Sequence, residues 1–165
     1  AENIIKKLLF PNNQAIILRS SWLISPNQNN FAHKILGLLE EKEKLEVVND
    51  QISCPTNVIN LAFLCWQIIS YKEEGIYFPN LLHWSDLGVA SWFDVAQSVS
   101  EIGQELGLLT SPAKIFPVRS QQYPQIATRP SFSLLDIGNT IIHLEMEPNY
   151  WRYSLRELLK IKLNK

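Results

Sequence analysis

The sequence predicts an α/β fold in which parallel strands are joined by crossover helices. Short apolar runs alternate along the chain with longer segments that have the 3.6-residue spacing of helices. The apolar runs lack a polar face, as expected for strands of a parallel sheet that helices cover on both sides. The alternation of helix and strand favours right-handed crossover connections. The composition, 46% hydrophobic and 19% charged over 165 residues, is ordinary for one globular domain.

The first half of the chain contains three expected helices and two expected strands. In order, they are the end of a helix at 1–9, a strand at 15–18, a helix at 31–43, a strand at 47–48 and a helix at 58–69. Asn30 and Thr56 stand at the starts of the second and third helices, where such side chains cap free backbone N–H groups. Helical spacing begins at Glu2 without a capping residue before it, so we expect the chain to be part of a longer protein.

The second half continues the alternation. In order, we expect a strand at 75–78, a loop at 83–88, a helix at 92–106, a strand at 115–118, a short helix that ends at 144 and a last helix at 151–163. Ser91 is expected to cap the first of these helices and Asp136 the second, and Asn149 begins the last. Residues 123–131 should be extended, because each proline in this segment disfavours helix in the residue before it.

Polar side chains follow two of the expected strands. In open α/β sheets, ligands bind at the carboxyl ends of the strands, so these side chains are candidate ligand contacts. They are Ser20, Ser21 and Trp22 after the first strand, and Asn49, Asp50 and Gln51 after the second. Each group also has a structural interpretation, as a Trp packed under a loop or as a polar turn. The pattern alone favours the structural role for the turn and leaves both roles open for the tryptophan.

Arg129 and the neighbours His83 and Asp86 are further candidates. A guanidinium on a stiff extended segment suits bidentate binding of a phosphate, although pairing with a surface carboxylate explains it equally well. His83 beside Asp86 would fit acid–base chemistry. No serine or cysteine nucleophile in a recognisable turn accompanies them, so a structural bond between the two is favoured.

Charge, hydropathy and cysteine spacing argue against several classes of function. The net charge is −1 and the basic residues are scattered, so nucleic acid is not an expected partner. The apolar runs are far shorter than the roughly 20 residues of a membrane-spanning helix. Cys54 and Cys65 lack the spacing of a zinc site or a disulfide framework, which favours reduced thiols in a cytoplasmic protein.

The sequence contains no complete catalytic apparatus. The six glycines form neither the Gly-x-Gly-x-x-Gly nor the phosphate-loop pattern, and no tyrosine is followed four residues later by a lysine. The three histidines lack the spacing of metal ligands. We therefore expect ligand contacts in this chain, but no catalytic residue and no metal site.

Several short motifs recur in the order and with the gaps of a known family. They are Arg19-Ser20-Ser21-Trp22, Asn29-Asn30-Phe31, Val48-Asn49-Asp50-Gln51, Cys54-Pro55-Thr56, His83-Trp84-Ser85-Asp86, Gly88-Val89-Ala90-Ser91-Trp92-Phe93-Asp94, Tyr123-Pro124, Arg129-Pro130 and Ser133-Leu134-Leu135-Asp136. With these motifs the chain resembles dTDP-4-dehydrorhamnose reductase, an extended short-chain dehydrogenase/reductase. The resemblance covers nearly the whole chain and only the C-terminal part of that family.

The resemblance implies the C-terminal portion of an NAD(P)-binding Rossmann-like fold with a small helical substrate-binding region. Residues 1–70 would complete the Rossmann-like sheet and residues 71–165 would form mainly the substrate-binding region of a single partial domain. The family reduces dTDP-4-dehydro-L-rhamnose to dTDP-L-rhamnose for polysaccharide biosynthesis, with NADPH or NADH. Its Tyr-x-x-x-Lys pair and glycine-rich turn would lie upstream of Ala1, so the isolated chain is expected to be inactive. Some members depend on magnesium, but no acidic cluster here identifies a site for it.

The resemblance also assigns roles to the candidate residues. Trp22 would lie against the sugar ring, with Ser20 and Ser21 near the nicotinamide and the sugar. Asn30, Gln51 and Arg129 would lie toward the nucleotide and the diphosphate. The implied partners are a dTDP-sugar and the N-terminal cofactor-binding half of the enzyme, and a homodimer is compatible with the family. Without that half, the strand at 15–18 should keep an unpaired apolar edge.

Two other functions remain open. One is a non-catalytic module that binds a sugar nucleotide without chemistry. The other is a related sugar-nucleotide epimerase or dehydratase, against which the Val-Asn-Asp-Gln and Gly-Val-Ala-Ser-Trp segments favour the reductase.

Overall fold

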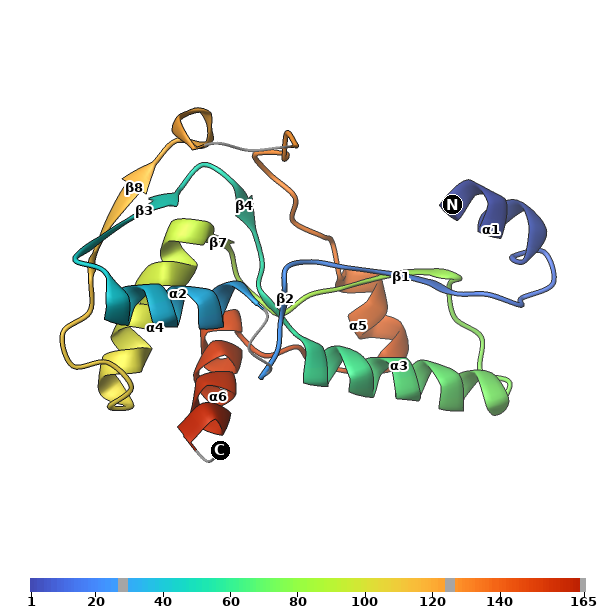
Figure 1. Cartoon of the computed structure of the whole chain (residues 1–165). Helices are drawn as coiled ribbons and strands as arrows, with labels where there is room; N and C mark the ends of the chain where they lie inside the picture. Colours follow the sequence, from blue (N-terminus) through green and yellow to red (C-terminus); the bar gives the residue numbers. More distant parts are fainter. Residues whose placement is uncertain (27–29, 124–126, 164–165) are drawn as a thin grey trace.

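The computed structural model describes residues 1–26, 30–123 and 127–163. Residues 27–29, and residues 124–126 of the expected extended segment, lie outside these ranges. The elements form two groups at opposite ends of an elongated molecule (Figure 1). We call them the α4 lobe, after helix α4 (Trp92–Glu105), and the β1 lobe, after strand β1 (Ile17–Ser20). Two short strand pairs lie between them. No helix within the described ranges is long and apolar enough to cross a membrane.

The α4 lobe combines three helices with one parallel strand pair. Its elements are α2 (Phe31–Glu41), β3 (Lys44–Val48), α4 (Trp92–Glu105), β8 (Lys114–Val118) and α6 (Trp151–Leu163). β3 and β8 run parallel, with Leu45 opposite Ile115. Buried side chains from all three helices meet in one core, among them Leu39, Val99 and Leu159. A 3-10 turn, η1 (Ser120–Gln122), follows β8.

The β1 lobe is built on a second parallel pair. Its elements are α1 (Glu2–Leu8), β1 (Ile17–Ser20), α3 (Val58–Glu73), β6 (Leu81–Trp84) and α5 (Gly138–Leu144). β1 and β6 pair in parallel, with Ile17 opposite Leu81. In Figure 1, α1 lies above β1 and α3 below it. Leu64 of α3, Leu82 of β6 and Leu144 of α5 meet in a second, smaller core.

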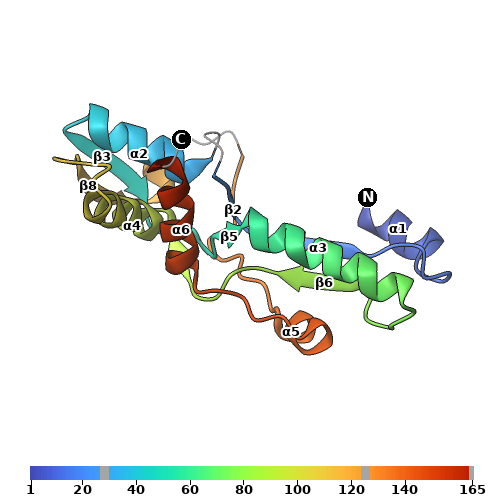
Figure 2. The same cartoon turned by 90° about the horizontal axis from the view of Figure 1, so that it is seen from below.

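The short strand pairs join the two lobes. β2 (Leu23–Ile24) runs parallel to β5 (Thr56–Asn57), and β4 (Ile52–Ser53) runs antiparallel to β7 (Ala90–Ser91). Figure 2 shows β2 and β5 at the start of α3, between the lobes. These pairs hold the segments after β1 and β3, which carry most of the candidate residues, close to the start of α4.

Several local predictions are confirmed. The Asn30 side chain caps α2 by accepting a hydrogen bond from the His33 N–H at 3.2 Å. Ser91 caps α4 as expected, and Asp94 completes a capping box with it. The expected strand at 115–118 is β8, and the last helix covers 151–163 as predicted. The expected α/β class with parallel strands and helices is therefore confirmed.

Other local predictions are wrong. Thr56 does not cap α3; it lies in β5, and Asn57 caps the helix by accepting from the Ile59 N–H at 2.8 Å. The strand predicted at 75–78 is absent, because Gly75 adopts φ +75° and ends α3 in a left-handed turn. The strand comes later, as β6, so the loop expected at 83–88 begins inside it. Asp136 accepts from the Gly138 N–H at 2.9 Å, although the cap position of α5 is Ile137.

The first expected strand lies two residues later than predicted, and it does not share a sheet with the second. β1 pairs with β6 and β3 pairs with β8, so the described strands form separate pairs instead of one continuous sheet. The expected division of the chain near residue 70 stays a prediction. Each of the two hydrophobic cores combines residues from before and after position 70, so side-chain packing does not follow that division.

Candidate functional site

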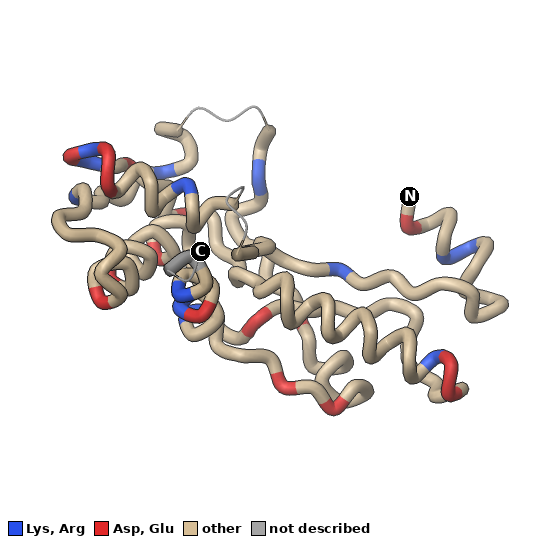
Figure 3. Tube along the Cα trace, turned by 60° about the horizontal axis from the view of Figure 1, so that its bottom comes forward, with Lys and Arg blue, Asp and Glu red and all other residues tan. Residues whose placement is uncertain are grey.

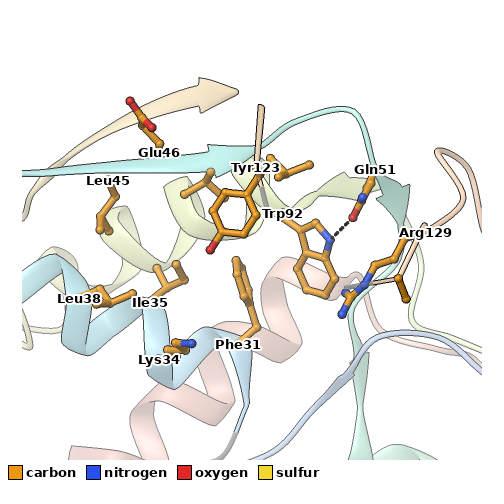
Figure 4. A pocket seen from close by; sticks show the side chains of 13 residues that line it. Phe31, Lys34, Ile35, Leu38, Leu45, Glu46, Gln51, Trp92, Tyr123 and Arg129 are labelled. Atoms are coloured by element: carbon orange, nitrogen blue, oxygen red, sulfur yellow. Dashed lines mark hydrogen bonds between the residues drawn. The ribbon is translucent and has the colours of Figure 1, made fainter. Parts of the chain in front are cut away.

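A hollow of about 610 Å³ lies between α2, β3 and the start of α4 (Figure 4). Its wall along α2 and β3 is mostly apolar, and aromatic and basic side chains complete it. The lining residues are Phe31, Lys34, Ile35, Leu38, Leu45, Glu46, Val47, Val48, Gln51, Trp92, Tyr123, Ala127 and Arg129. Aromatic faces suit a planar ring, and the two cations, Lys34 and Arg129, suit an anionic group.

Trp92 is the centre of this site. Its indole N–H donates a hydrogen bond to Oε1 of Gln51 at 3.1 Å, and Gln51 is only 5% exposed. The Phe31 ring is tilted by 58° against the indole, at 4.6 Å between ring centroids. The guanidinium carbon of Arg129 lies 5.9 Å from the centroid of the Trp92 ring, within the range of a cation–π interaction.

A second hollow of about 190 Å³ shares Phe31 and Trp92 with the first. Trp22 and Asn30 also line it. The Trp22 ring stacks on Trp92 with 3.6 Å between centroids and an interplanar angle of 13°. Phe31 and Trp92 therefore stand between two adjoining hollows, a large one with both cations and a small one with Trp22.

Two helix caps place the shared aromatic residues. Phe31 is the first residue of α2, directly after the cap Asn30. Trp92 is the first residue of α4, directly after Ser91, whose Oγ accepts from the Asp94 N–H at 3.0 Å. A capped first turn has a defined backbone direction, so each ring is held by the start of its helix.

Four of the six predicted site residues converge on these hollows. Gln51 and Arg129 line the large hollow, and Trp22 and Asn30 line the small one. Part of Asn30 is already engaged, since its Nδ2 donates to the Ser25 carbonyl oxygen at 2.8 Å. The four residues come from three stretches of the chain, around positions 22–30, 51 and 129, and the fold brings them together around Trp92.

The other candidates do not line either hollow. Ser20 donates to the Trp84 carbonyl oxygen at 3.0 Å, and the Oγ atoms of Ser21 and Ser53 lie 2.6 Å apart. Asp50 accepts from the N–H and the hydroxyl of Ser120, at 2.9 and 3.1 Å, and so fixes the turn after β8. Of the polar residues 49–51 after β3, only Gln51 lines the large hollow.

The prediction that His83 bonds to Asp86 is wrong. Nδ1 of His83 lies 3.1 Å from the Asp136 carbonyl oxygen, and Nε2 lies 3.4 Å from Nη1 of Arg19. Asp86 is 1% exposed, and burial raises the pKa of its carboxyl to about 6. Within the described part of the chain, no three His, Cys, Asp or Glu side chains are placed to hold a metal ion.

Sequence reasoning missed Phe31, Lys34, Trp92 and Tyr123. Phe31 and Trp92 each directly follow a helix cap near the carboxyl end of a strand, and that position is a usable signal. Periodicity alone assigns such rings to the core. Lys34 stands three residues after Phe31 on the same face of α2, so it could have been found once Phe31 was chosen.

Comparisons with known proteins agree with one another. Residues 1–163 match the RmlD substrate binding domain family. The spore coat polysaccharide biosynthesis protein SpsK of Bacillus subtilis is 33% identical over 144 residues, which are 87% of this chain and 46% of SpsK. The dTDP-4-dehydrorhamnose reductase of Escherichia coli K12 is 29% identical over 144 residues, covering 87% of this chain and 48% of that protein. A solved dTDP-4-dehydrorhamnose reductase of Bacillus anthracis in complex with NADP matches with a TM-score of 0.80 at 27% identity, covering 96% of this chain and 52% of that one. This chain thus spans about half the length of the curated relatives it matches.

Proposed function

The chain belongs to the RmlD substrate binding domain family, and from this we propose that it is the sugar-nucleotide-binding part of a dTDP-4-dehydrorhamnose reductase. In the complete enzyme, dTDP-4-dehydro-L-rhamnose would be reduced to dTDP-L-rhamnose with NADPH. The observation that carries the proposal is the convergence of Trp22, Gln51 and Arg129 around Trp92. Free thiols at Cys54 and Cys65 support a cytoplasmic location.

The two hollows suggest how the ligand is placed. The thymine ring and the diphosphate belong in the large hollow, which offers the rings of Phe31 and Tyr123 and the charges of Lys34 and Arg129. The sugar belongs toward the small hollow and Trp22. A diphosphate between two cations gains charge-assisted hydrogen bonds, and a sugar or base gains contact with flat aromatic faces. Both ends of the ligand would then be held by this chain.

The reducing equivalent comes from outside this chain. NADPH supplies a hydride, but the sequence has no glycine-rich turn to cradle its pyrophosphate and no Tyr-x-x-x-Lys pair to deliver a proton. The role assigned to this chain is therefore to bind and orient the sugar nucleotide. We expect the chain to be inactive alone and to need a cofactor-binding half.

The β1 lobe offers a surface for that half. α3 presents a row of apolar side chains to solvent, of which Phe63 is 65% and Trp66 is 70% exposed. Figure 3 shows that the charges of α3 are confined to its C-terminal end. Within the described ranges β1 pairs only with β6, so its other edge is open to a further strand. An apolar helix face beside an open strand edge fits a partner that continues the parallel sheet.

A two-step experiment tests the proposal. Calorimetric titration of the chain with dTDP and with dTDP-rhamnose should show binding of both. Mixing the chain with the N-terminal half of a related reductase should then restore NADPH oxidation in the presence of the 4-keto sugar nucleotide. Failure of the chain to bind either compound would contradict the proposal.

The second candidate, a binding module without chemistry, is supported by one observation. Both hollows form within this chain and are lined by the predicted contacts Trp22, Gln51 and Arg129, which can hold a ligand without any catalytic group. Tight binding of dTDP-rhamnose, combined with no turnover in any folded mixture, would favour this candidate.

A further inference from the structure

We propose that Trp92 is the positioning residue of this site: its indole fixes Trp22 on the sugar side and Gln51 on the nucleotide side, so one side chain aligns both ends of the binding surface. The inference rests on the proposed function and deepens it. It assigns a role to a residue that neither its helical spacing nor its place in a motif identifies as functional.

The contacts of Trp92 reach both hollows. On one side, the indole stacks on Trp22 at 3.6 Å and nearly in parallel, which restricts the orientation of the Trp22 ring. At its edge, the N–H donates to Gln51 at 3.1 Å, which fixes the direction of a buried amide. Arg129 lies near the same ring, with its guanidinium carbon 5.9 Å from the centroid. A change at Trp92 therefore alters three candidate ligand contacts at once.

Backbone pairing explains why Trp92 meets Gln51. In the antiparallel pair of β4 and β7, Ile52 is opposite Ser91 and Ser53 is opposite Ala90. Continuing this register by one residue places Gln51 opposite Trp92. Cross-strand neighbours in such a pair have close side chains, so the hydrogen bond follows from the register.

Backbone contacts also hold the second partner in place. The Thr56 N–H donates to the Trp22 carbonyl oxygen at 2.7 Å, and the next strand pair begins at Leu23. Trp92 itself is held by the capping box at Ser91 and Asp94. Two aromatic rings with fixed backbones and stacked faces form a preorganised surface, which reduces the entropy lost when a ligand binds.

The Trp92 indole meets both requirements, a flat face for Trp22 and a donor for Gln51. Phenylalanine provides a flat face for Trp22 but has no donor for Gln51. Leucine provides neither. Gln51 is buried, so loss of the Trp92 donor removes a hydrogen bond from an amide oxygen that water does not readily reach.

The test titrates this chain with dTDP alone by calorimetry and compares variants. Trp92→Phe removes the donor, Trp92→Leu removes the donor and the face, and Gln51→Met removes the acceptor at similar volume. Trp151→Phe is the matched control, because Trp151 is 3% exposed in α6 and lines neither hollow. Circular dichroism reports the stack directly, because two stacked indoles give a coupled pair of bands of opposite sign.

We expect Trp92→Phe to weaken dTDP binding by about three- to tenfold, the equivalent of one hydrogen bond. Trp92→Leu should weaken it by roughly ten- to a hundredfold, because stacking is lost as well. In the Gln51→Met background, Trp92→Phe should cause little further loss, since the bond is already absent. Trp92→Phe and Trp22→Phe should both abolish the coupled bands, and Trp151→Phe should keep them.

Each contrary result has a distinct meaning. A wild-type chain that does not bind dTDP overturns the proposed function and this inference with it. A wild-type chain that binds dTDP, with Trp92→Phe equal to Trp151→Phe, overturns the inference alone. Additive losses of dTDP affinity for Trp92→Phe and Gln51→Met would also overturn the inference alone. A wild-type circular dichroism spectrum without coupled bands would do the same. If Trp92→Leu does not fold, the two conservative variants still decide the question.

Discussion

The hydroxyl of Thr140 in α5 lies between the backbone groups of His83 in β6, accepting from the N–H at 3.2 Å and donating to the C=O at 2.6 Å. One side chain thereby satisfies the outward-facing backbone groups at this point of β6 and covers that edge. The two edges of the β1–β6 pair consequently differ, since β1 has no comparable cover among the described residues.

Thr140→Val should destabilise the protein by about 1 to 3 kcal/mol. The change keeps the shape of the side chain but removes two hydrogen bonds, and Thr140 is only 1% exposed. Urea unfolding followed by circular dichroism measures the effect. Thr110→Val is the control, because Thr110 is exposed, and an equal loss for both variants would refute a specific role for Thr140.

Asp86→Asn should change how stability depends on pH. Burial raises the pKa of the Asp86 carboxyl from 3.8 to about 6, although the Ser154 hydroxyl and the Asn57 backbone N–H act in the opposite direction. The folded state therefore holds a proton that the unfolded state loses, and this carboxyl destabilises the fold as the pH rises from about 4 to about 7. The stability of the wild type relative to the variant should fall by roughly 2 to 3 kcal/mol over that range.

Unfolding free energies measured at several pH values check this expectation. The Cys54 thiol, which donates to the Asp86 carbonyl oxygen at 2.9 Å, stays protonated throughout, because burial and the Asp86 charge raise its pKa to about 12. A constant difference between wild type and Asp86→Asn at all pH values would show that Asp86 does not titrate in this range.

Trp66→Ser should make the isolated chain more soluble and weaken its association with a cofactor-binding half. Trp66 is 70% exposed in the apolar row of α3, and its burial in an interface would stabilise the complex by about 2 kcal/mol. Sedimentation of the mixture measures the association. Tyr153→Ser, at a site 56% exposed in α6, serves as the control. Unchanged association of Trp66→Ser would place the interface elsewhere.

Arg129→Ala should weaken dTDP binding about tenfold while barely changing the affinity for thymidine, which has no phosphate. The dTDP affinity of Arg129→Lys should lie between those of the wild type and Arg129→Ala, because an ammonium keeps the charge without the bidentate geometry of a guanidinium. Calorimetry with both ligands measures the two affinities. Lys44→Ala removes an exposed charge that does not line the hollow and should behave as wild type. Equal losses for dTDP and thymidine would mean that Arg129 does not contact the phosphates.

The sequence predicted those parts of the fold that depend on local chemistry. The caps Asn30 and Ser91 are confirmed because each stands directly before the first residue of its helix, whereas Thr56 stands one residue too early and Asn57 caps α3 instead. The strand expected at 75–78 failed because its apolar residues looked like a strand, although Gly75 was needed to end α3. Phe78 is 5% exposed, so it packs in the core without belonging to a strand.

The sequence identified some residues of the candidate site and missed others. Gln51 and Arg129 follow from polar or charged chemistry at a strand end or in an extended segment, and both line the large hollow. Trp92 was missed because its role depends on a two-residue pairing between β4 and β7. Such a short pair leaves no periodic signal in the sequence, and its partners are about 40 positions apart.

The two separate cores affect how the molecule unfolds locally. Trp22, Phe31 and Trp92 all pack against the core of the α4 lobe, and the smaller core holds none of them. Ligand should therefore slow the exchange of amide hydrogens mainly in α2, α4 and α6, and leave α3 and β6 to open at their own rate. The α4 lobe would then bind the substrate and the β1 lobe would bind a partner. Each lobe would be a cooperative unit that unfolds independently of the other.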